Sequence, residues 1–179
     1  VTASVNGITT TFSVNSYTVD KSSKKFDTSP YDQYAAQLNQ RWKDEEAGSS
    51  TILFIGDSFF DVRYFWTNFY ATYASEDALG FGISSATSYD WEVYLDSWFG
   101  ELNPSIIVMH IGTNNVYDDF DSAEEAILSL QRMFTLMHGK MQKTPIYYFG
   151  ISQRNYDQDK INTVNTINSE MKAWCAERS

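Results

Sequence analysis

The sequence is poor in cysteine, histidine and long apolar runs, and each shortage excludes a class of protein. Cys175 is the only cysteine, so the chain cannot form an internal disulfide. With only two histidines besides, a Cys/His metal site cannot be assembled. We expect no metal ion and no organic cofactor. No apolar run approaches the roughly 20 residues that cross a bilayer, so we also expect no membrane insertion.

Basic residues are scarce as well. The 179 residues hold 13 lysines and arginines against 23 aspartates and glutamates, which gives a net charge of -10. This balance argues against binding to nucleic acid or to an anionic membrane. A neutral or cationic small molecule, or a glycan, suits such a surface better. Hydrophobic residues make up 42% of the chain and aromatic residues 16%, as expected of a folded domain with a real core.

The first residues differ in composition from the rest. Residues 1–20 are rich in Val, Thr and Ser, and Asn6-Gly7 between two β-prone runs predicts a hairpin. We interpret residues 1–28 as a β-prone extension or as the tail of a preceding module. Ser29-Pro30 then resembles a cap followed by proline at the first helical position, which opens the main domain, residues 29–179.

From Thr51 onward, strand patterns alternate with helix patterns. The expected strands are Ile52–Ile55, Ala78–Phe81, Ile106–Ile111 and Ile146–Phe149. The expected helices are a first one ending near Glu46, then Phe59–Tyr73, Tyr89–Glu101, Ser122–Gln142 and Gln158–Ala176. Near-continuous apolar strands between amphipathic helices predict an α/β fold with a parallel sheet covered on both faces.

Each expected strand ends in glycine followed by small polar residues. The four segments are Gly56-Asp57-Ser58, Gly82-Ile83-Ser84, Gly112-Thr113-Asn114-Asn115 and Gly150-Ile151-Ser152. Functional groups of open parallel sheets gather at the carboxyl ends of the strands. The sequence therefore predicts a site at this edge of the sheet.

Three residues of these segments each allow a structural and a functional interpretation. Ser58 is either an ordinary cap at a helix start or a nucleophile, and the Gly-x-Ser-x-Gly elbow of many hydrolases is absent around it. Gly82 provides either a tight turn or close backbone approach, or a backbone N–H that points into the crevice. Asn114 is either a turn residue or a side-chain amide donor.

Taken together, three segments resemble the SGNH hydrolases, also called GDSL-type esterases. "FIGDSFF", "GFGISSAT" and "HIGTNN" match the first three family blocks in order, and the resemblance covers roughly Thr51 to Lys172. It implies a flavodoxin-like three-layer α/β/α sandwich in which Ser58 is the nucleophile. It also implies an oxyanion hole formed by the N–H groups of Ser58 and Gly82 and by Nδ2 of Asn114. The implied activity is hydrolysis of small acyl esters, such as O-acetyl groups on carbohydrate, through an acyl-serine.

The chain departs from the family pattern at three places. Gly80 stands where the second block usually begins with Asn, and Asn115 replaces the acid of the third block. The Asp-x-x-His motif that supplies the base is missing, and we expect that the chain stops before it. His110 is then either a packed strand histidine or a substitute base, while His138 suits the end of a helix. A catalytically silent relative that binds a glycan or a partner therefore remains an alternative, and a nucleotide-binding domain ranks last.

The neighbourhood of the serine completes the predicted site. We expect Asp57, Phe59 and Asn115 to contact substrate, and most other aromatic residues after Ser58 to belong to the core. Asp61 and Arg63 are interpreted as solvated charges. The acidic, cysteine-poor composition is also typical of a secreted or cell-surface bacterial protein.

Overall fold

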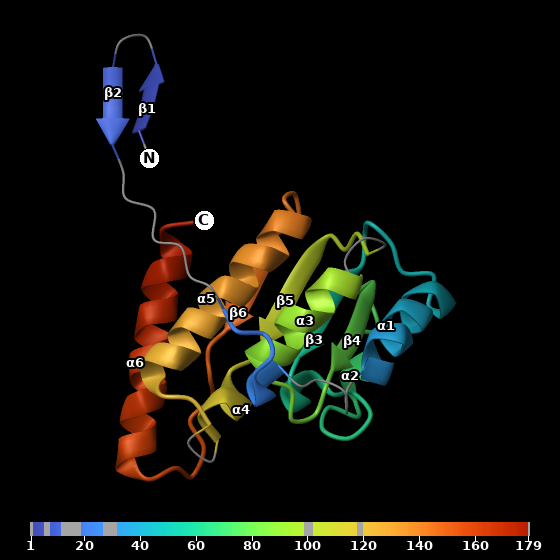
Figure 1. Cartoon of the computed structure of the whole chain (residues 1–179). Helices are drawn as coiled ribbons and strands as arrows, with labels where there is room; N and C mark the ends of the chain where they lie inside the picture. The colour runs from blue at the N-terminus through green and yellow to red at the C-terminus, as the bar shows by residue number, and fades with distance from the viewer. Residues whose placement is uncertain are drawn as a thin grey trace.

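The main domain is built on a parallel four-stranded sheet. The computed structural model describes residues 2–5, 8–11, 19–26, 32–98, 102–117 and 120–178. The strands are β3 (Ile52–Gly56), β4 (Ala78–Gly82), β5 (Ile106–His110) and β6 (Ile146–Phe149), in the order β4-β3-β5-β6 (Figure 1). All neighbours pair in parallel, so the predicted strands and the α/β class are confirmed. This order corresponds to the first four strands of the flavodoxin-like arrangement.

The N-terminal segment forms a separate hairpin. β1 (Thr2–Val5) pairs antiparallel with β2 (Ile8–Thr11) in a two-stranded sheet of its own, which confirms the predicted hairpin. The turn residues Asn6-Gly7 and the predicted helix start at Ser29-Pro30 lie outside the described residues. The division of the chain at residue 28 stays a prediction.

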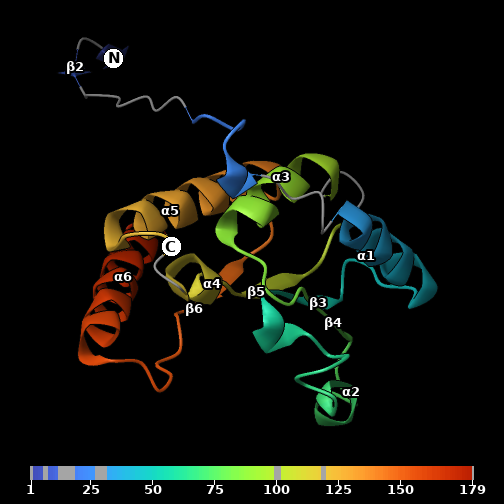
Figure 2. The same ribbon diagram turned by 60° about the horizontal axis from the view of Figure 1, so that its bottom comes forward.

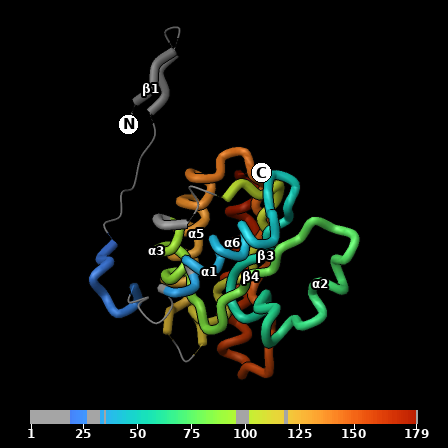
Figure 3. The backbone as a smooth tube through the Cα atoms, turned by 90° about the vertical axis from the view of Figure 1, so that its right-hand side faces the viewer, coloured from blue at the N-terminus to red at the C-terminus, as the bar shows by residue number. Residues whose placement is uncertain are grey.

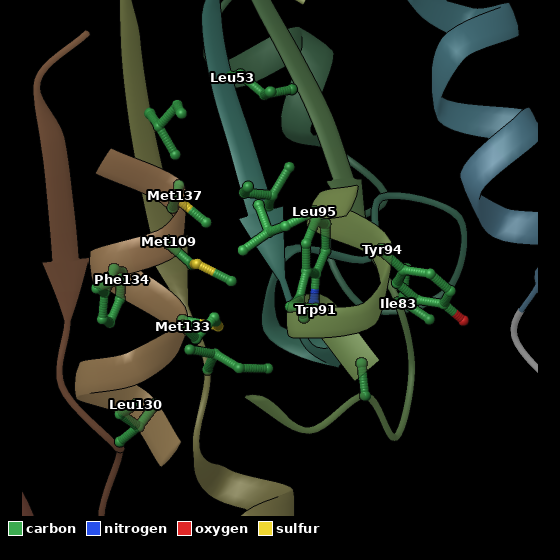
Figure 4. Packing of buried hydrophobic residues seen from close by; sticks show 14 of the residues in the cluster. Leu53, Ile83, Trp91, Tyr94, Leu95, Met109, Leu130, Met133, Phe134 and Met137 are labelled. Atoms are coloured by element: carbon green, nitrogen blue, oxygen red, sulfur yellow. The ribbon is translucent and has the colours of Figure 1, made fainter. Parts of the chain in front are cut away.

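Four long helices contribute side chains to one core cluster on one face of the sheet. They are α1 (Asp32–Asp44), α3 (Ser88–Trp98), α5 (Ala123–Lys140) and α6 (Gln158–Ala176). Figure 2 shows α3 and α5 on the side of the sheet opposite α2 (Phe69–Thr72). Alternate strand residues point into the core between sheet and helices, where they meet buried helix residues (Figure 4). The core includes Leu53, Ile55, Met109, Trp91, Leu95, Leu130, Met133 and Met137.

The opposite face carries a second, aromatic cluster in place of the predicted helix Phe59–Tyr73, and that prediction was wrong. After β3 the chain makes a 3-10 turn, η3 (Ser58–Phe60), and only the short α2 is α-helical. The buried rings of Phe60 and Phe69 pack edge-on against Phe54, at centroid distances of 5.4 and 5.1 Å. Figure 3 shows this segment looping away from the sheet.

The physical reason for the missing helix lies at Asp61. Its backbone carbonyl accepts hydrogen bonds from the N–H groups of Phe65 and Trp66, which closes a local turn. Its carboxylate accepts from the Arg63 side chain and from Ser84 Oγ. Such local side-chain bonds compete with helix formation. The aromatic residues whose spacing favoured a helix pack their rings against the sheet instead.

The strand register brings the carboxyl ends of β3, β4 and β5 level with one another. Gly56 lies opposite Gly82 on one side and opposite His110 on the other. The strand order reverses between β3 and β5, and ligands of open sheets bind in the crevice at such a point. The polar segments that follow these strands therefore meet at one edge. No described helix is both long enough and apolar enough to cross a membrane.

The capping box at the start of α5 offers a test of the helical layer. Ser122 Oγ accepts from the Glu125 N–H, and the Glu125 carboxylate accepts from the Ser122 N–H. We expect Ser122→Ala to lower the free energy of unfolding in urea by about 1 kcal/mol. Ser169→Ala, at an exposed position inside α6, is the matched control and should cost nothing because alanine favours helices. Equal losses in the two variants would contradict this role of the cap.

Candidate active site

Ser58 lies directly after β3, at the start of the 3-10 turn. β3 ends at Gly56 with a φ of 134°, where a Cβ would stand 1.8 Å from the carbonyl oxygen of His110, so only glycine fits. Asp57 caps the turn because its Oδ1 accepts from the Phe59 N–H at 2.9 Å. Ser58 itself is partly exposed. The local sequence thus places Ser58 at the edge of the sheet, and its role as the nucleophile stays a prediction.

Gly82 packs against this turn. A Cβ on Gly82 would lie 2.3 Å from both the carbonyl oxygen of Asp57 and the carbonyl carbon of Phe60. The N–H of the next residue, Ile83, donates to the carbonyl of Gly56 at 2.9 Å. The predicted close backbone approach therefore occurs, and it brings the end of β4 into contact with the serine turn.

Asn114 lies just after the carboxyl end of β5. It lies on the short α4 (Thr113–Val116), which follows Gly112 with a φ of 112°. Its Nδ2 donates to the carbonyl of Ala86 at 2.8 Å, four residues after Gly82. The amide is thus held on the segment that follows β4, and it remains half-buried. Ser58, Gly82 and Asn114 come from three adjoining strand ends that are tied to one another.

Asn115 has a structural position. The side chain is completely buried. Its Oδ1 accepts from the Ser88 N–H, and its Nδ2 donates to Ser88 Oγ and Asp121 Oδ2. These bonds fix α4 against α3. Because no part of Asn115 is exposed, the structure gives it a positioning role in place of the predicted substrate contact.

Asp57 is likewise buried and faces inward. Its Oδ1 lies 2.9 Å from Nδ1 of His110, and its backbone N–H donates to the His110 carbonyl. The carboxylate therefore orients the serine turn, and it does not have the exposed surface that the predicted substrate contact needs. Of the three residues expected to touch substrate, Phe59 alone has an exposed side chain.

His110 has one more polar neighbour. The ring is buried, as expected for a packed strand histidine, and stacks on Phe59 with centroids 4.4 Å apart. Its Nε2 faces Ser152 Oγ at 3.4 Å. His138 is exposed in the last turn of α5. Among the described residues, neither histidine forms a hydrogen bond with Ser58 Oγ.

A pocket of about 390 Å³ opens beside Ser58. Three aromatic residues form most of its wall, and one cation stands at its rim. The lining residues are Ser58, Phe59, Phe65, Trp66 and Arg154. Sequence reasoning missed Arg154, which follows β6, although a basic residue shortly after a strand end is a usable signal. The pocket suits a neutral or anionic ligand with an apolar face.

Asp61 is buried and forms an ion pair with the more exposed Arg63, so the expectation of a solvated charge is wrong for Asp61. Burial opposes ionisation of the Asp61 carboxyl, but hydrogen bonds from Arg63 and Ser84 outweigh it and lower the pKa of Asp61. The hydrogen bond to Asp61 in turn raises the pKa of Arg63. Ser84 follows Gly82, so this pair fastens the segment after β4 to the segment after Ser58.

Comparison with known proteins places the chain in a known fold. No protein-family model and no curated protein matches the sequence. A GDSL-like lipase from Bacteroides thetaiotaomicron is similar in structure, with a TM-score of 0.60, 20% identity, and coverage of 87% of this chain and 76% of that chain. A carbohydrate esterase family 3 protein from Talaromyces cellulolyticus gives a TM-score of 0.54 at 17% identity, covering 71% and 72%.

An acetyl-xylooligosaccharide esterase from Geobacillus, solved as a point variant, gives a TM-score of 0.55 at 18% identity over 73% of each chain. These similarities show that the chain has the fold of the SGNH hydrolases, as the three sequence blocks imply.

Replacing Gly82 tests the contact between β4 and the serine turn. We expect Gly82→Ala to lower the free energy of unfolding by about 1–3 kcal/mol, the usual cost of overpacking, because the new methyl group meets backbone atoms of the turn. Gly139→Ala on α5 is the control, since a Cβ there has no neighbour within 4 Å and alanine favours the helix. Chemical denaturation measures both. An unchanged Gly82→Ala variant would contradict the close approach.

Replacing Asp61 tests this ion pair through pH. Because the pKa of Asp61 is lower in the folded than in the unfolded chain, its ionisation stabilises the fold above the unfolded value of about 3.9. This stabilisation is lost as the pH falls below that value. We expect Asp61→Asn to be less stable than the parent at pH 7 and the difference to shrink below about pH 4. Thermal unfolding between pH 7 and pH 3 measures it, and a difference that does not change with pH argues against the pairing.

Proposed function

We propose that the protein is a carboxylic-ester hydrolase in which Ser58 accepts the acyl group. The observation that carries the proposal is the position of Ser58, in a pocket at the point where the strand order reverses. Ligands of open α/β sheets bind at this point, so a partly exposed serine there can reach a bound substrate. The similarity in fold to esterases and lipases supports the same class of reaction.

The proposed chemistry is acyl transfer in two steps. Ser58 Oγ attacks the ester carbonyl, and the negative charge that forms on the carbonyl oxygen is stabilised by fixed donors. The backbone N–H groups of Ser58 and Gly82 and the side-chain amide of Asn114 are the proposed donors. The bond between the carbonyl carbon and the ester oxygen then breaks, and the alcohol takes up a proton and leaves. Water hydrolyses the acyl-serine, which releases the acid and restores the serine. Gly82 and Asn114 both lie on segments tied to the turn, so their donors move little during the reaction.

The substrate class we propose is a small acyl ester on carbohydrate. Phe59, Phe65 and Trp66 offer aromatic surface beside the serine, which suits the apolar face of a sugar ring. The solved structures with the same fold include a carbohydrate esterase and an acetyl-xylooligosaccharide esterase. This supports the acetyl group as the acyl group that is transferred to the serine. The secreted or cell-surface location expected from the composition agrees with a glycan substrate and stays a prediction.

A second candidate function is a silent domain that binds a glycan without cleaving it. The observation that favours it is that, within the described part of the chain, the imidazole of His110 faces Asp57 and Ser152 and forms no hydrogen bond with Ser58 Oγ. A serine hydroxyl is a weak nucleophile without an adjacent base. The enzyme hypothesis therefore requires a base that reaches Ser58 from elsewhere, such as the Asp-x-x-His block of the family.

Hydrolysis of p-nitrophenyl acetate and of acetylated xylooligosaccharides distinguishes the two functions. For the esterase, Ser58→Ala should reduce kcat/KM by at least about a hundredfold. Ser169→Ala is the control, since Ser169 is an exposed serine on α6 outside the pocket beside Ser58. If the parent and Ser58→Ala hydrolyse both substrates at the same background rate, while calorimetry detects binding of the oligosaccharide, the silent function is supported instead.

A further inference from the structure

Three side chains from three strand ends form a continuous polar line beneath the pocket. Asp57 follows β3, His110 ends β5, and Ser152 follows β6. Nδ1 of His110 lies 2.9 Å from Oδ1 of Asp57, and Nε2 on the other side of the ring lies 3.4 Å from Oγ of Ser152. The order carboxylate, imidazole, hydroxyl is that of a serine relay, and Ser58 is not part of it.

The imidazole is held in the orientation that such a relay needs. A carboxylate that faces Nδ1 keeps the proton on that nitrogen, so Nε2 carries the free lone pair. This lone pair faces the Ser152 hydroxyl. The 3.4 Å separation is long, but catalytic hydrogen bonds are often long before substrate binds and tighten afterwards. The ring cannot turn freely, because Phe59 stacks on one face.

Burial strengthens the pair at the base of the line. Asp57 and His110 expose 0% and 1% of their surface, so the charge that forms on the imidazole faces a carboxylate in a medium of low dielectric constant. Ser152 is partly exposed and lies between the exposed residues Gly150 and Gln153. The hydroxyl is thus reachable from solvent while its partners are not.

The backbone beside Ser152 is fixed in place. Asn168 on α6 accepts from the Ile151 N–H at 2.8 Å and donates to the Ile151 carbonyl at 2.9 Å. A Cβ on Gly150 would lie 2.8 Å from the same Asn168 side chain, so the chain approaches α6 closely there. These contacts hold Ser152 on a rigid support, as a reactive group requires.

We propose that Asp57, His110 and Ser152 form a second serine site, in which Ser152 is an activated hydroxyl that accepts acyl groups from small activated esters or phosphoryl groups from phosphorofluoridates. Nε2 of His110 takes the Ser152 proton while the Oγ electron pair forms a bond to the acyl carbon or the phosphorus. The bond to the leaving group then breaks, and the leaving group departs with its electron pair and takes the proton from Nε2. Asp57 stabilises the transient imidazolium. The site is independent of Ser58 and goes beyond the proposed function.

Labelling with diisopropyl fluorophosphate tests the site directly. The full chain is treated at pH 7.5, digested, and the modified serines are identified and timed by mass spectrometry of the peptides. Ser152 should be labelled at least about a hundredfold faster than Ser84, the gain that a positioned general base commonly gives. Ser84 is the matched reference because it is also partly exposed and bonds to a carboxylate, Asp61, without an imidazole between.

Two further measurements separate a relay from a merely accessible serine. Asp57→Asn and His110→Gln should each lower the labelling rate of Ser152 toward that of Ser84. Because both residues are buried, the variants can fail to fold. The parent is therefore also labelled in about 8 M urea, a concentration that unfolds most small domains. There the preference for Ser152 should disappear.

Each possible result decides the inference. Fast labelling of Ser152 that is lost in the folded Asp57→Asn variant, or in urea, supports the second site. Labelling of Ser58 alone overturns the inference while it supports the proposed function. Labelling of Ser152 at the rate of Ser84, or no modified serine at all, also overturns it. Equal labelling of Ser152 in the parent and in folded His110→Gln shows that the imidazole does not activate the hydroxyl.

Discussion

The hydrogen bond between the Asp57 carboxylate and the His110 imidazole is the constraint on which the rest of the site depends. Asp57 is completely buried, and the same oxygen that accepts from His110 also accepts from the Phe59 N–H at the start of the serine turn. A buried carboxylate without partners costs several kcal/mol, so both bonds must form together. The conformation of the turn that carries Ser58 is therefore decided by a residue of the neighbouring strand, and the serine cannot be repositioned without disturbing β5.

Close backbone approach makes this arrangement possible. A Cβ on Gly56 would overlap the backbone of His110, and a Cβ on Gly82 would overlap the backbone of the serine turn. β3 therefore contacts β5, and β4 contacts the serine turn, through main-chain atoms. Asp61 reinforces the contact from the other side, where Arg63 and Ser84 satisfy its carboxylate. Donors fixed in this way need little reorganisation when charge develops on a bound group, which is the property that an oxyanion site requires. The same packing explains why the aromatic segment after Ser58 cannot continue as a helix.

The sequence predicted the parts of the molecule that follow from local pattern. The four strands and the helix Gln158–Ala176 were confirmed because apolar runs and helical spacing act within a few residues. The helix Phe59–Tyr73 was not found, since its aromatic spacing also serves rings that cover a sheet, and Asp61 closes a turn there. The roles of Asn114 and Asn115 could not be separated either, because only packing shows which amide is buried. The Asp57–His110 bond depends on the register of β3 against β5, which no single strand encodes.

One imidazole cannot serve two serines at once. Nδ1 of His110 is occupied by Asp57, and the single lone pair on Nε2 faces Ser152. For His110 to accept a proton from Ser58, Phe59 would have to leave its stacked position and the ring would have to give up the buried carboxylate. That loss removes the His110 partner of a buried carboxylate whose Oδ2 already has no hydrogen-bond partner among the described residues, which is costly. The proton acceptor for Ser58 and the relay at Ser152 are therefore separate requirements, although both serines depend on the bond between Asp57 and His110.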